Sequence, residues 1–286
     1  MNYFERIQNS IDFIELHLKE EIDMYEVASQ SFFSVTHFYR VFQAMVGDSV
    51  KEYIRKRQLS NAAIELLTTD KRLIDVAFDY RFESQEVFTR AFARTFGITP
   101  GRYRKQKNRL FLFEKANVKT KNLENETGGI FMEPKIIFDK EFKIAGIKAS
   151  VKPGSGSIDD LWHEFNSRRV EIENTVNPNV ALGLCEYMPN ITDESEFSYC
   201  ACVEVTDFEG IPKDITIKTI PTSKYAVFTH KGPMTGLKAT YDFIYGTWLP
   251  KSDYELAERD TIEWYDSRSS DLSSPDYEFD IYLPLK

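Results

Sequence analysis

An internal repeat at an offset of about fifty residues constrains the fold of this chain more than any other feature. Residues 34–53 read SVTHFYRVFQAMVGDSVKEY, and residues 84–103 read SQEVFTRAFARTFGITPGRY. The identical pairs at an offset of fifty are Ser34 and Ser84, Phe38 and Phe88, Arg40 and Arg90, Phe42 and Phe92, Gly47 and Gly97, and Tyr53 and Tyr103. Upstream the offset is forty-nine, because Val27-Ala28 matches Val76-Ala77. The chain therefore carries one supersecondary unit twice.

Each copy of the repeat has the layout of a helix-turn-helix unit. A short helix containing Val-Ala leads into a turn, a serine that can cap the next helix, and a longer helix that stops at glycine. The second helix of such a unit buries one face and presents the other to a major groove. The phenylalanines at four-residue spacing define the buried face. A pair of amphipathic helices in an ordinary bundle is the competing interpretation, and the matched spacing of two copies argues against it.

The face opposite the phenylalanines carries the candidate DNA contacts. Arginine can pair with guanine, glutamine with adenine, and threonine or valine can touch a thymine methyl group. Glu86 has two interpretations, as an acceptor from cytosine or as a cap for its helix N-terminus. The candidate residues are Val35, Thr36, Tyr39, Arg40, Gln43, Gln85, Glu86, Thr89, Arg90 and Arg94.

The charge of the chain is unevenly distributed. The net charge is −9, yet residues 31–110 hold 15 Lys and Arg against 8 Asp and Glu. Residues 111–286 hold 19 basic residues against 30 acidic ones. A basic module on an acidic chain is typical of a polyanion partner for that module alone, although ordinary surface charge gives the same count.

The hydrophobic pattern changes from helical to strand-like along the chain. Residues 2–104 show apolar residues at three- and four-residue spacing, which predicts successive helices. Residues 105–131 are mixed and charged and end in Gly-Gly, which is typical of a flexible linker. Strands are predicted at 135–149, 180–187, 197–205, 215–221, 224–230, 261–266 and 277–285, with helices at 157–173 and 234–249. The order strand–helix–strand–strand thus occurs twice in an α+β domain.

Several classes of protein are disfavoured by composition. No apolar run is long enough to cross a membrane, and the acidic amphipathic N-terminus does not resemble a signal peptide. Three cysteines form neither a disulfide framework nor a zinc motif, and four scattered histidines form no ligand set. We therefore expect a cytoplasmic protein with no metal, no cofactor and no membrane partner. No catalytic residues are predicted, because no Ser-His-Asp set or Cys-His pair is recognisable, and we expect the chain not to be an enzyme.

The first domain resembles the AraC/XylS family of transcription regulators. The stretch IDVAFDYRFESQEVFTRAFARTFGITPGRYRK at 74–105 carries the resemblance, and RKRQLSNAAIELL at 55–67 is similar to the helix that joins the family's two helix-turn-helix units. The likeness is strongest to the Rob-like subgroup, in which the DNA-binding domain comes first. Val35 and Thr36 replace that subgroup's Lys-Trp pair, which predicts a different base preference. The implied DNA-binding domain is 1–107, with units at about 22–46 and 72–97.

The second domain resembles the GyrI-like effector-binding domain, which also follows the DNA-binding domain in the Rob-like subgroup. EPKIIFDKEFKIAGIKA, SKYAVFTHKGP, TIEWYDSR and EFDIYLPLK carry this resemblance over residues 132–286, leaving 108–131 as the linker. The resemblance implies a duplicated β-α-β-β fold with a groove for small lipophilic, often cationic, ligands. Glu263 stands where the family carries its acid, and strand alternation puts Tyr265 on its face and Trp264 on the other. Further candidates are Tyr187, Tyr225, Trp248 and Tyr282, for which a role in the core is the alternative.

Together the two resemblances imply a ligand-responsive regulator, and we expect an activator. Its expected partners are double-stranded DNA read in two adjacent major grooves about 34 Å apart, a small-molecule effector and RNA polymerase. Two alternatives for the second domain remain open. It could be a hydrolase, as some free-standing GyrI-like proteins resemble hydrolases that use a Glu and a Tyr, or it could bind a protein partner.

Overall fold

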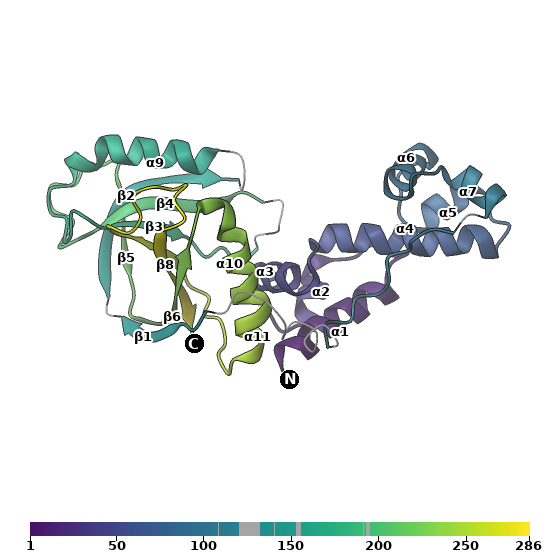
Figure 1. Cartoon of the computed structure of the whole chain (residues 1–286), viewed down its shortest axis with the longest axis horizontal. Coiled ribbons are helices and arrows are strands. Elements are labelled where there is room, and N and C mark those ends of the chain that lie inside the picture. The colour runs from purple at the N-terminus through teal and green to yellow at the C-terminus, as the bar shows by residue number, and fades with distance from the viewer. Residues whose placement is uncertain (108, 120–131, 140, 153–155, 191, 193–194) are drawn as a thin grey trace. The chain divides into compact units, whose positions relative to one another are not determined.

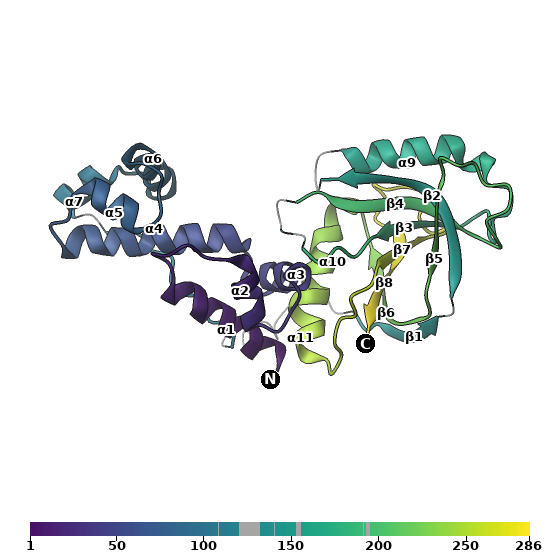
Figure 2. The ribbon, with the colours of Figure 1, turned by 180° about the vertical axis from the view of Figure 1, so that it is seen from behind.

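The computed structural model describes residues 1–107, 109–119, 132–139, 141–152, 156–190, 192 and 195–286. The chain divides into two compact units, Met1–Gly128 and Gly129–Lys286, which are described separately below (Figure 1 and, from behind, Figure 2). Within the described residues, no helix is long and apolar enough to span a membrane.

The first unit is helical, as the three- and four-residue spacing predicts. Its helices are α1 (Tyr3–Leu16), α2 (Met24–Gln30), α3 (Val35–Val46), α4 (Val50–Thr68), α5 (Leu73–Asp79), α6 (Gln85–Phe96) and α7 (Pro100–Gln106). The long helix α4 lies between two helix-turn-helix units, α2–α3 and α5–α6. The tandem arrangement predicted from the repeat is therefore confirmed.

Both second helices begin and end as the repeated residues predict. The Ser34 and Ser84 hydroxyls accept hydrogen bonds from the amides of His37 and Val87, at 3.4 and 3.2 Å. Gly47 and Gly97 end α3 and α6 with φ of 92° and 72°, a conformation that glycine adopts without steric cost. The two copies thus have matched boundaries.

Phenylalanines form the interior of both helix-turn-helix units. Phe38 and Phe42 are fully buried on α3, with ring centroids 5.4 Å apart. Phe88 and Phe92 occupy the matching positions on α6, with centroids 5.6 Å apart. Burying a phenylalanine side chain contributes about 1.5–3 kcal/mol, so these stacks account for much of each small core.

The second unit is an α+β domain with one eight-stranded antiparallel sheet. Its strands are β1 (Lys135–Asp139), β2 (Phe142–Val151), β3 (Ala181–Cys185), β4 (Phe197–Val205), β5 (Thr216–Ile220), β6 (Ser223–Lys231), β7 (Thr261–Tyr265) and β8 (Glu278–Leu285). Its helical segments are α9 (Ser157–Arg168), η1 (Arg169–Glu171), η2 (Met234–Gly236), α10 (Leu237–Phe243), the π-helical η3 (Ile244–Trp248) and α11 (Leu249–Lys251). The predicted strand at 135–149 is two strands, β1 and β2, in the structure.

The strand order reveals the internal duplication. The order is β1-β6-β8-β7-β3-β4-β2-β5, so β7, β8 and β6 extend from the centre on one side as β3, β4 and β2 do on the other. β3 and β7 meet at the centre, where Gly183 pairs with Glu263. Gly183 also pairs with Ala201 of β4, and Glu263 pairs with Ile281 of β8. The predicted duplicated β-α-β-β fold is confirmed, and Glu263 lies at its pseudo-symmetric centre.

The two faces of the sheet bury different residues. One face carries Tyr199, Ala201 and Glu263, and Leu161 and Phe165 of α9 pack against this face (Figure 1). The other face carries a second core cluster, which includes Leu182 and Ile262. Side chains on one strand alternate between the faces, so register decides which residues can meet.

The predicted linker is described only in part. Residue 108 and residues 120–131 lie outside the described residues. Residues 109–119 pack on the helical unit. Leu110 and Leu112 lie against the core that α4 to α7 form, and Val118 is buried. The prediction of a flexible linker is therefore wrong for 109–119, because these residues find apolar and hydrogen-bonding partners on the helices.

Candidate functional site

The exposed face of α6 presents polar side chains, as the repeat predicts. Glu86, Arg90 and Arg94 are exposed, and Gln85 and Thr89 are half-buried. The Ser84 hydroxyl and the Glu86 backbone amide lower the pKa of the Glu86 carboxyl by hydrogen bonding. Ser84 is the cap of α6, and Glu86 lies in the first turn, where a carboxylate interacts favourably with the helix N-terminus. Contact of Glu86 with cytosine stays a prediction.

The corresponding face of α3 is less polar than that of α6. Val35, Ala44 and Met45 stand in place of Gln85, Arg94 and Thr95. Arg40 and Gln43 are partly exposed. The DNA contacts predicted for Val35, Thr36 and Tyr39 stay predictions.

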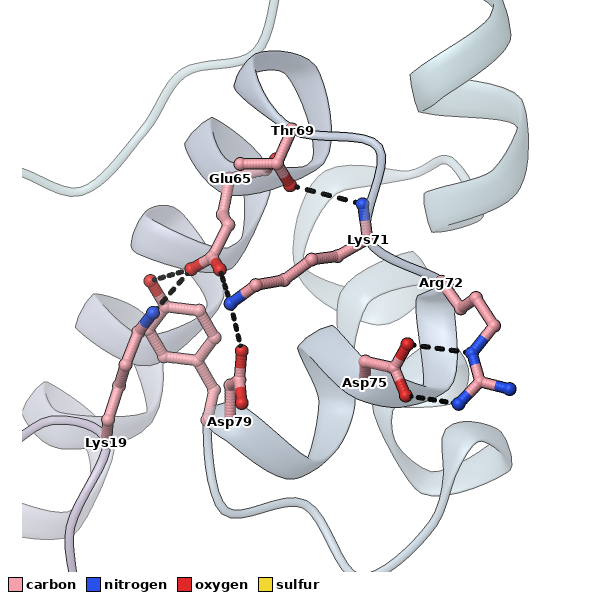
Figure 3. Close-up of polar contacts among 8 residues, drawn as sticks. Lys19, Glu65, Thr69, Lys71, Arg72, Asp75 and Asp79 are labelled. Atoms are coloured by element: carbon pink, nitrogen blue, oxygen red, sulfur yellow. Dashed lines mark hydrogen bonds and ion pairs between the residues drawn. The ribbon is translucent and has the colours of Figure 1, made fainter.

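A network of ion pairs centred on Glu65 joins α4 to α5 and to the segment between α1 and α2. The Glu65 carboxylate accepts from Lys19 Nζ and Lys71 Nζ, each at 2.6 Å, and from the Tyr80 hydroxyl at 3.0 Å (Figure 3). Lys71 also reaches Asp79 at 2.6 Å. Burial would raise the pKa of Glu65, but these donors outweigh it and lower the pKa to about 2. The carboxylate thus stays charged and holds α4, α5 and the end of α1 together.

Three tyrosine hydroxyls converge on the carboxylate of Glu263 in the second unit. Tyr199 of β4 and Tyr265 of β7 donate to Oε2 at 2.7 and 2.9 Å, and Tyr241 of α10 donates to Oε1 at 2.9 Å. Glu263 is 6% exposed. A carboxylate has about four acceptor positions, and the three tyrosines fill three of them. None of these three hydrogen-bond partners is a cationic side chain.

Gly183 makes room for this cluster. A β-carbon at Gly183 would lie 2.0 Å from the Tyr199 hydroxyl and 2.9 Å from Glu263 Oε2. Gly183 is paired directly with Glu263 in the sheet, so any larger side chain would fill the space that the hydroxyl occupies. Glycine at this position is thus required for the hydrogen bond between Tyr199 and Glu263.

The tyrosines remain protonated donors within an aromatic environment. Burial, together with the neighbouring Glu263 charge, raises the pKa of Tyr199, Tyr241 and Tyr265 well above the ordinary value. The ring of Trp162 on α9 meets Tyr265 edge-on at 5.3 Å and lies 6.5 Å from Tyr199. The carboxylate therefore lies among aromatic rings from α9, β4 and β7.

The predicted effector residues do not all come together. Tyr265 joins Glu263, as strand alternation predicts. The prediction that Tyr225 and Tyr282 line the same site as Glu263 is wrong. Both tyrosines pack with Trp264 on the opposite face of the sheet. The ring of Trp248 meets that of Phe228 edge-on, with centroids 4.9 Å apart. Phe228 pairs with Ile281, which pairs with Glu263, so Phe228 lies two strands away from Glu263. Tyr187 follows β3, where its amide donates to Asp260 at 2.8 Å.

Tyr199, Tyr241, Gly183 and Trp162 were missed by sequence reasoning. Tyr199 could have been found, because alternation in β4 sets it apart from the two cysteines of the same strand. Tyr241 lies on a helix, and only the packing of α10 on the sheet brings it to Glu263.

A nearby polar pair was also missed, in which His230 Nδ1 lies 2.7 Å from the Thr240 hydroxyl. Burial lowers the pKa of His230, although nearby backbone groups and Glu263 oppose the shift. In the part of the chain that the structure describes, no three His, Cys, Asp or Glu residues are placed to hold a metal.

Comparison with family models assigns both units. Residues 132–286 match the GyrI-like small molecule binding domain, and residues 27–106 match a helix-turn-helix domain. Two exposed arginines on a recognition helix, a tandem helix-turn-helix unit and a small-molecule binding domain define a DNA-binding transcription regulator.

Curated relatives agree with this class. The transcriptional regulator Rob of Salmonella typhimurium is 27% identical over 271 residues, covering 91% of this chain and 89% of Rob. The regulatory protein SoxS of the same organism is 36% identical over 104 residues, covering 36% of this chain and 97% of SoxS. The uncharacterized regulator YbfP of Bacillus subtilis is 50% identical over 104 residues, which is 36% of this chain and only 35% of YbfP. The chain belongs to the AraC/XylS family of transcription regulators, with a GyrI-like domain after the DNA-binding domain.

Proposed function

We propose that this regulator is an activator that inserts α3 and α6 into two adjacent major grooves and responds to a small lipophilic cation bound at Glu263. Arg40 and Arg90 are the principal DNA contacts in this account. Thr36, Tyr39, Gln43, Gln85, Thr89 and Arg94 are the next candidates, and Val35 and Glu86 lie beside them. The exposed Arg90 and Arg94 of α6 support the DNA contact, because arginine can bind both phosphate and guanine.

The observation that carries the effector proposal is the buried Glu263 carboxylate with its three tyrosine donors. A buried carboxylate without a partner of opposite charge is costly, and a bound cation would supply that charge. One acceptor position of Oε1 remains beyond the bond from Tyr241. The rings of Tyr199, Tyr265 and Trp162 would add cation–π attraction of ~0.5–2 kcal/mol each.

Two hydrophobic ions of matched size and opposite charge test this proposal. Binding of tetraphenylphosphonium and tetraphenylborate to the full chain would be measured by thermal shift and calorimetry. The cation at 100 times its dissociation constant should stabilise the wild type by ~2.7 kcal/mol, and the anion should not. Glu263→Gln should abolish the cation effect, while Tyr282→Phe, on the opposite face of the sheet, should retain it. Equal binding of both ions, or an unaffected Gln variant, contradicts a countercharge role for Glu263.

The hydrolase alternative has one supporting observation, since a glutamate and tyrosines do lie together at Glu263. Incubating ester probes with the chain and measuring product separates binding from turnover. We expect no turnover beyond buffer. Turnover that Glu263→Gln abolishes would instead support an enzyme. A protein-interaction role would show as partner binding that neither the cation nor Glu263→Gln changes.

The activator role is tested by transcription in vitro. Purified RNA polymerase, a promoter carrying the selected binding site and the full chain should give more transcript with the regulator than without it. An Arg90→Ala variant should not increase transcript, because it no longer holds the second half-site. Reduced transcript with the wild type would identify a repressor.

A further inference from the structure

Residues 109–119, called the strap here, lie along α1 and α4 with their backbone bonded to side chains. The amides of Phe113, Ala116 and Val118 donate to Ser60 Oγ at 3.0 Å, to the Tyr53 hydroxyl at 3.3 Å and to Gln8 Oε1 at 3.1 Å. This segment is irregular over residues 109–117, and because each of these amides finds a partner, it is docked specifically.

One end of the strap packs on the second helix-turn-helix unit. Leu110 and Leu112 pack against the core formed by α4 to α7. The ring of Phe113 lies 6.3 Å from that of Phe96 at the end of α6, and Lys56 Nζ lies 5.3 Å from the Phe113 ring centroid. This end of the strap therefore contacts the second recognition helix directly.

The other end of the strap packs on α1, whose Ser10 hydroxyl in turn donates to the Val27 carbonyl of α2 at 2.9 Å. The Gln8 side-chain amide accepts from Val118 and donates to the Ala116 carbonyl at 3.3 Å, as a paired strand would. Val118 is 1% exposed. Lys115 Nζ pairs with Asp12 Oδ1 at 2.8 Å. Burial would raise the pKa of Asp12, but Lys115 and Gln8 outweigh it and lower the pKa, so the pair is charged at neutral pH.

The middle of the strap completes a network between α1 and α4. Arg57 forms a two-point ion pair with Glu15 of α1 and also donates to the Phe113 carbonyl. The Tyr53 hydroxyl donates to Glu15 at 2.7 Å while it accepts from Ala116. Both α4 side chains therefore hold the first helix and the strap at once.

From these contacts we infer that the strap is a positioning element, which fixes the two recognition helices at the spacing needed to read two half-sites together. The inference rests on the proposed reading of DNA by α3 and α6. Apart from the strap and α4, the described contacts between the two ends of the domain include the ion pair of Arg81 with Glu21 at 3.7 Å, whose side chains are 51% and 90% exposed. Exposed ion pairs stabilise little. The strap adds buried apolar contacts with the core of α4 to α7, and on α1 it adds the hydrogen bonds of Gln8 and the ion pair of Lys115, so it resists bending of α4.

The test compares release of the strap with a matched change on its exposed side. The double variant Gln8→Ala and Phe113→Ala removes one anchor from each end, and Phe111→Ala is the control because Phe111 is 89% exposed. Hydrogen exchange of the full chain reports docking at the amides of Phe113, Ala116 and Val118. Affinity is measured for a duplex with both half-sites selected by the wild type and for duplexes with either half-site scrambled.

We expect the double variant to exchange these amides faster and to lose about tenfold in affinity for the two-site duplex, with single-site affinity unchanged. An equal loss on all duplexes would show a general folding contribution and would overturn the inference. The inference would also be overturned if the double variant kept the same ratio of two-site to single-site affinity as Phe111→Ala, whether or not its amides exchange faster. If the double variant is unfolded by circular dichroism, Gln8→Ala alone is judged by the same criteria. Failure of the proposed DNA reading is distinguishable, because the wild type itself would then show no two-site advantage.

Discussion

At the scale of single residues, the decisive arrangement is the pair of Gly183 and Glu263 at the centre of the sheet. The glycine leaves space into which Tyr199 extends, and the tyrosine hydroxyl then reaches the carboxylate. The hydroxyls of Tyr265 on β7 and Tyr241 on α10 also donate to this carboxylate. The buried carboxylate is thus held by three hydroxyl donors.

Replacing Gly183 with alanine should damage both stability and effector binding. The new methyl group would overlap the Tyr199 hydroxyl, so the tyrosine or the strand must move, and overpacking of this kind costs about 1–3 kcal/mol. Chemical denaturation and tetraphenylphosphonium binding would be measured together. Gly101→Ala serves as the control, because its β-carbon would meet only Leu73 Cδ1, at 3.6 Å. Wild-type binding in Gly183→Ala would show that the cluster is not needed.

Sequence reasoning could predict only part of this cluster. Glu263 and Tyr265 share a strand, so alternation places them on one face. Tyr199 and Tyr241 are distant in sequence, and nothing local shows that β4 and α10 converge on β7. Tyr225 and Tyr282 were predicted to join the site because they are aromatic. Register places them on the other face, and register depends on pairing of the whole sheet.

At the scale of elements, the two recognition helices share caps and cores but differ in their outer faces. Each starts at a serine, ends at a glycine and buries its phenylalanines, and these features were readable from the repeat. The apolar outer face of α3 was also visible in the sequence, at Val35, Ala44 and Met45.

The Glu65 network predicts an acid-dependent loss of stability in the helical unit. The pKa of the Glu65 carboxyl in the folded state, about 2, lies below the ordinary value of 4.5. The contribution of Glu65 to the free energy of unfolding is therefore complete above about pH 4.5 and is lost as pH falls toward 2. Glu65→Gln should cost about 1–3 kcal/mol at pH 7 and flatten the dependence of unfolding free energy on pH in that window. Urea denaturation across pH would measure this. Glu21→Gln, at a side chain that is 90% exposed, should change little; a parallel loss there would refute the network's role.

At the scale of the whole molecule, the sequence predicts two units of different class, and the described residues confirm both folds. The strap was not predicted, because 105–131 has no hydrophobic period and its docking uses backbone amides, which leave no pattern in the sequence. Its amides bond to the side chains of Gln8, Tyr53 and Ser60, which are distant in sequence, and its leucines pack on a core that other helices form.

The central claim is that one chain reads two half-sites through α3 and α6, and selection from a random duplex library tests it most directly. The wild type should select two conserved blocks with centres about 10–10.5 base pairs apart. Arg40→Ala should erase the preference in one block and Arg90→Ala in the other. Arg72→Ala, whose side chain is 78% exposed outside both recognition helices, should leave both blocks intact. A single block, or two blocks that neither recognition-helix variant alters, would contradict the account.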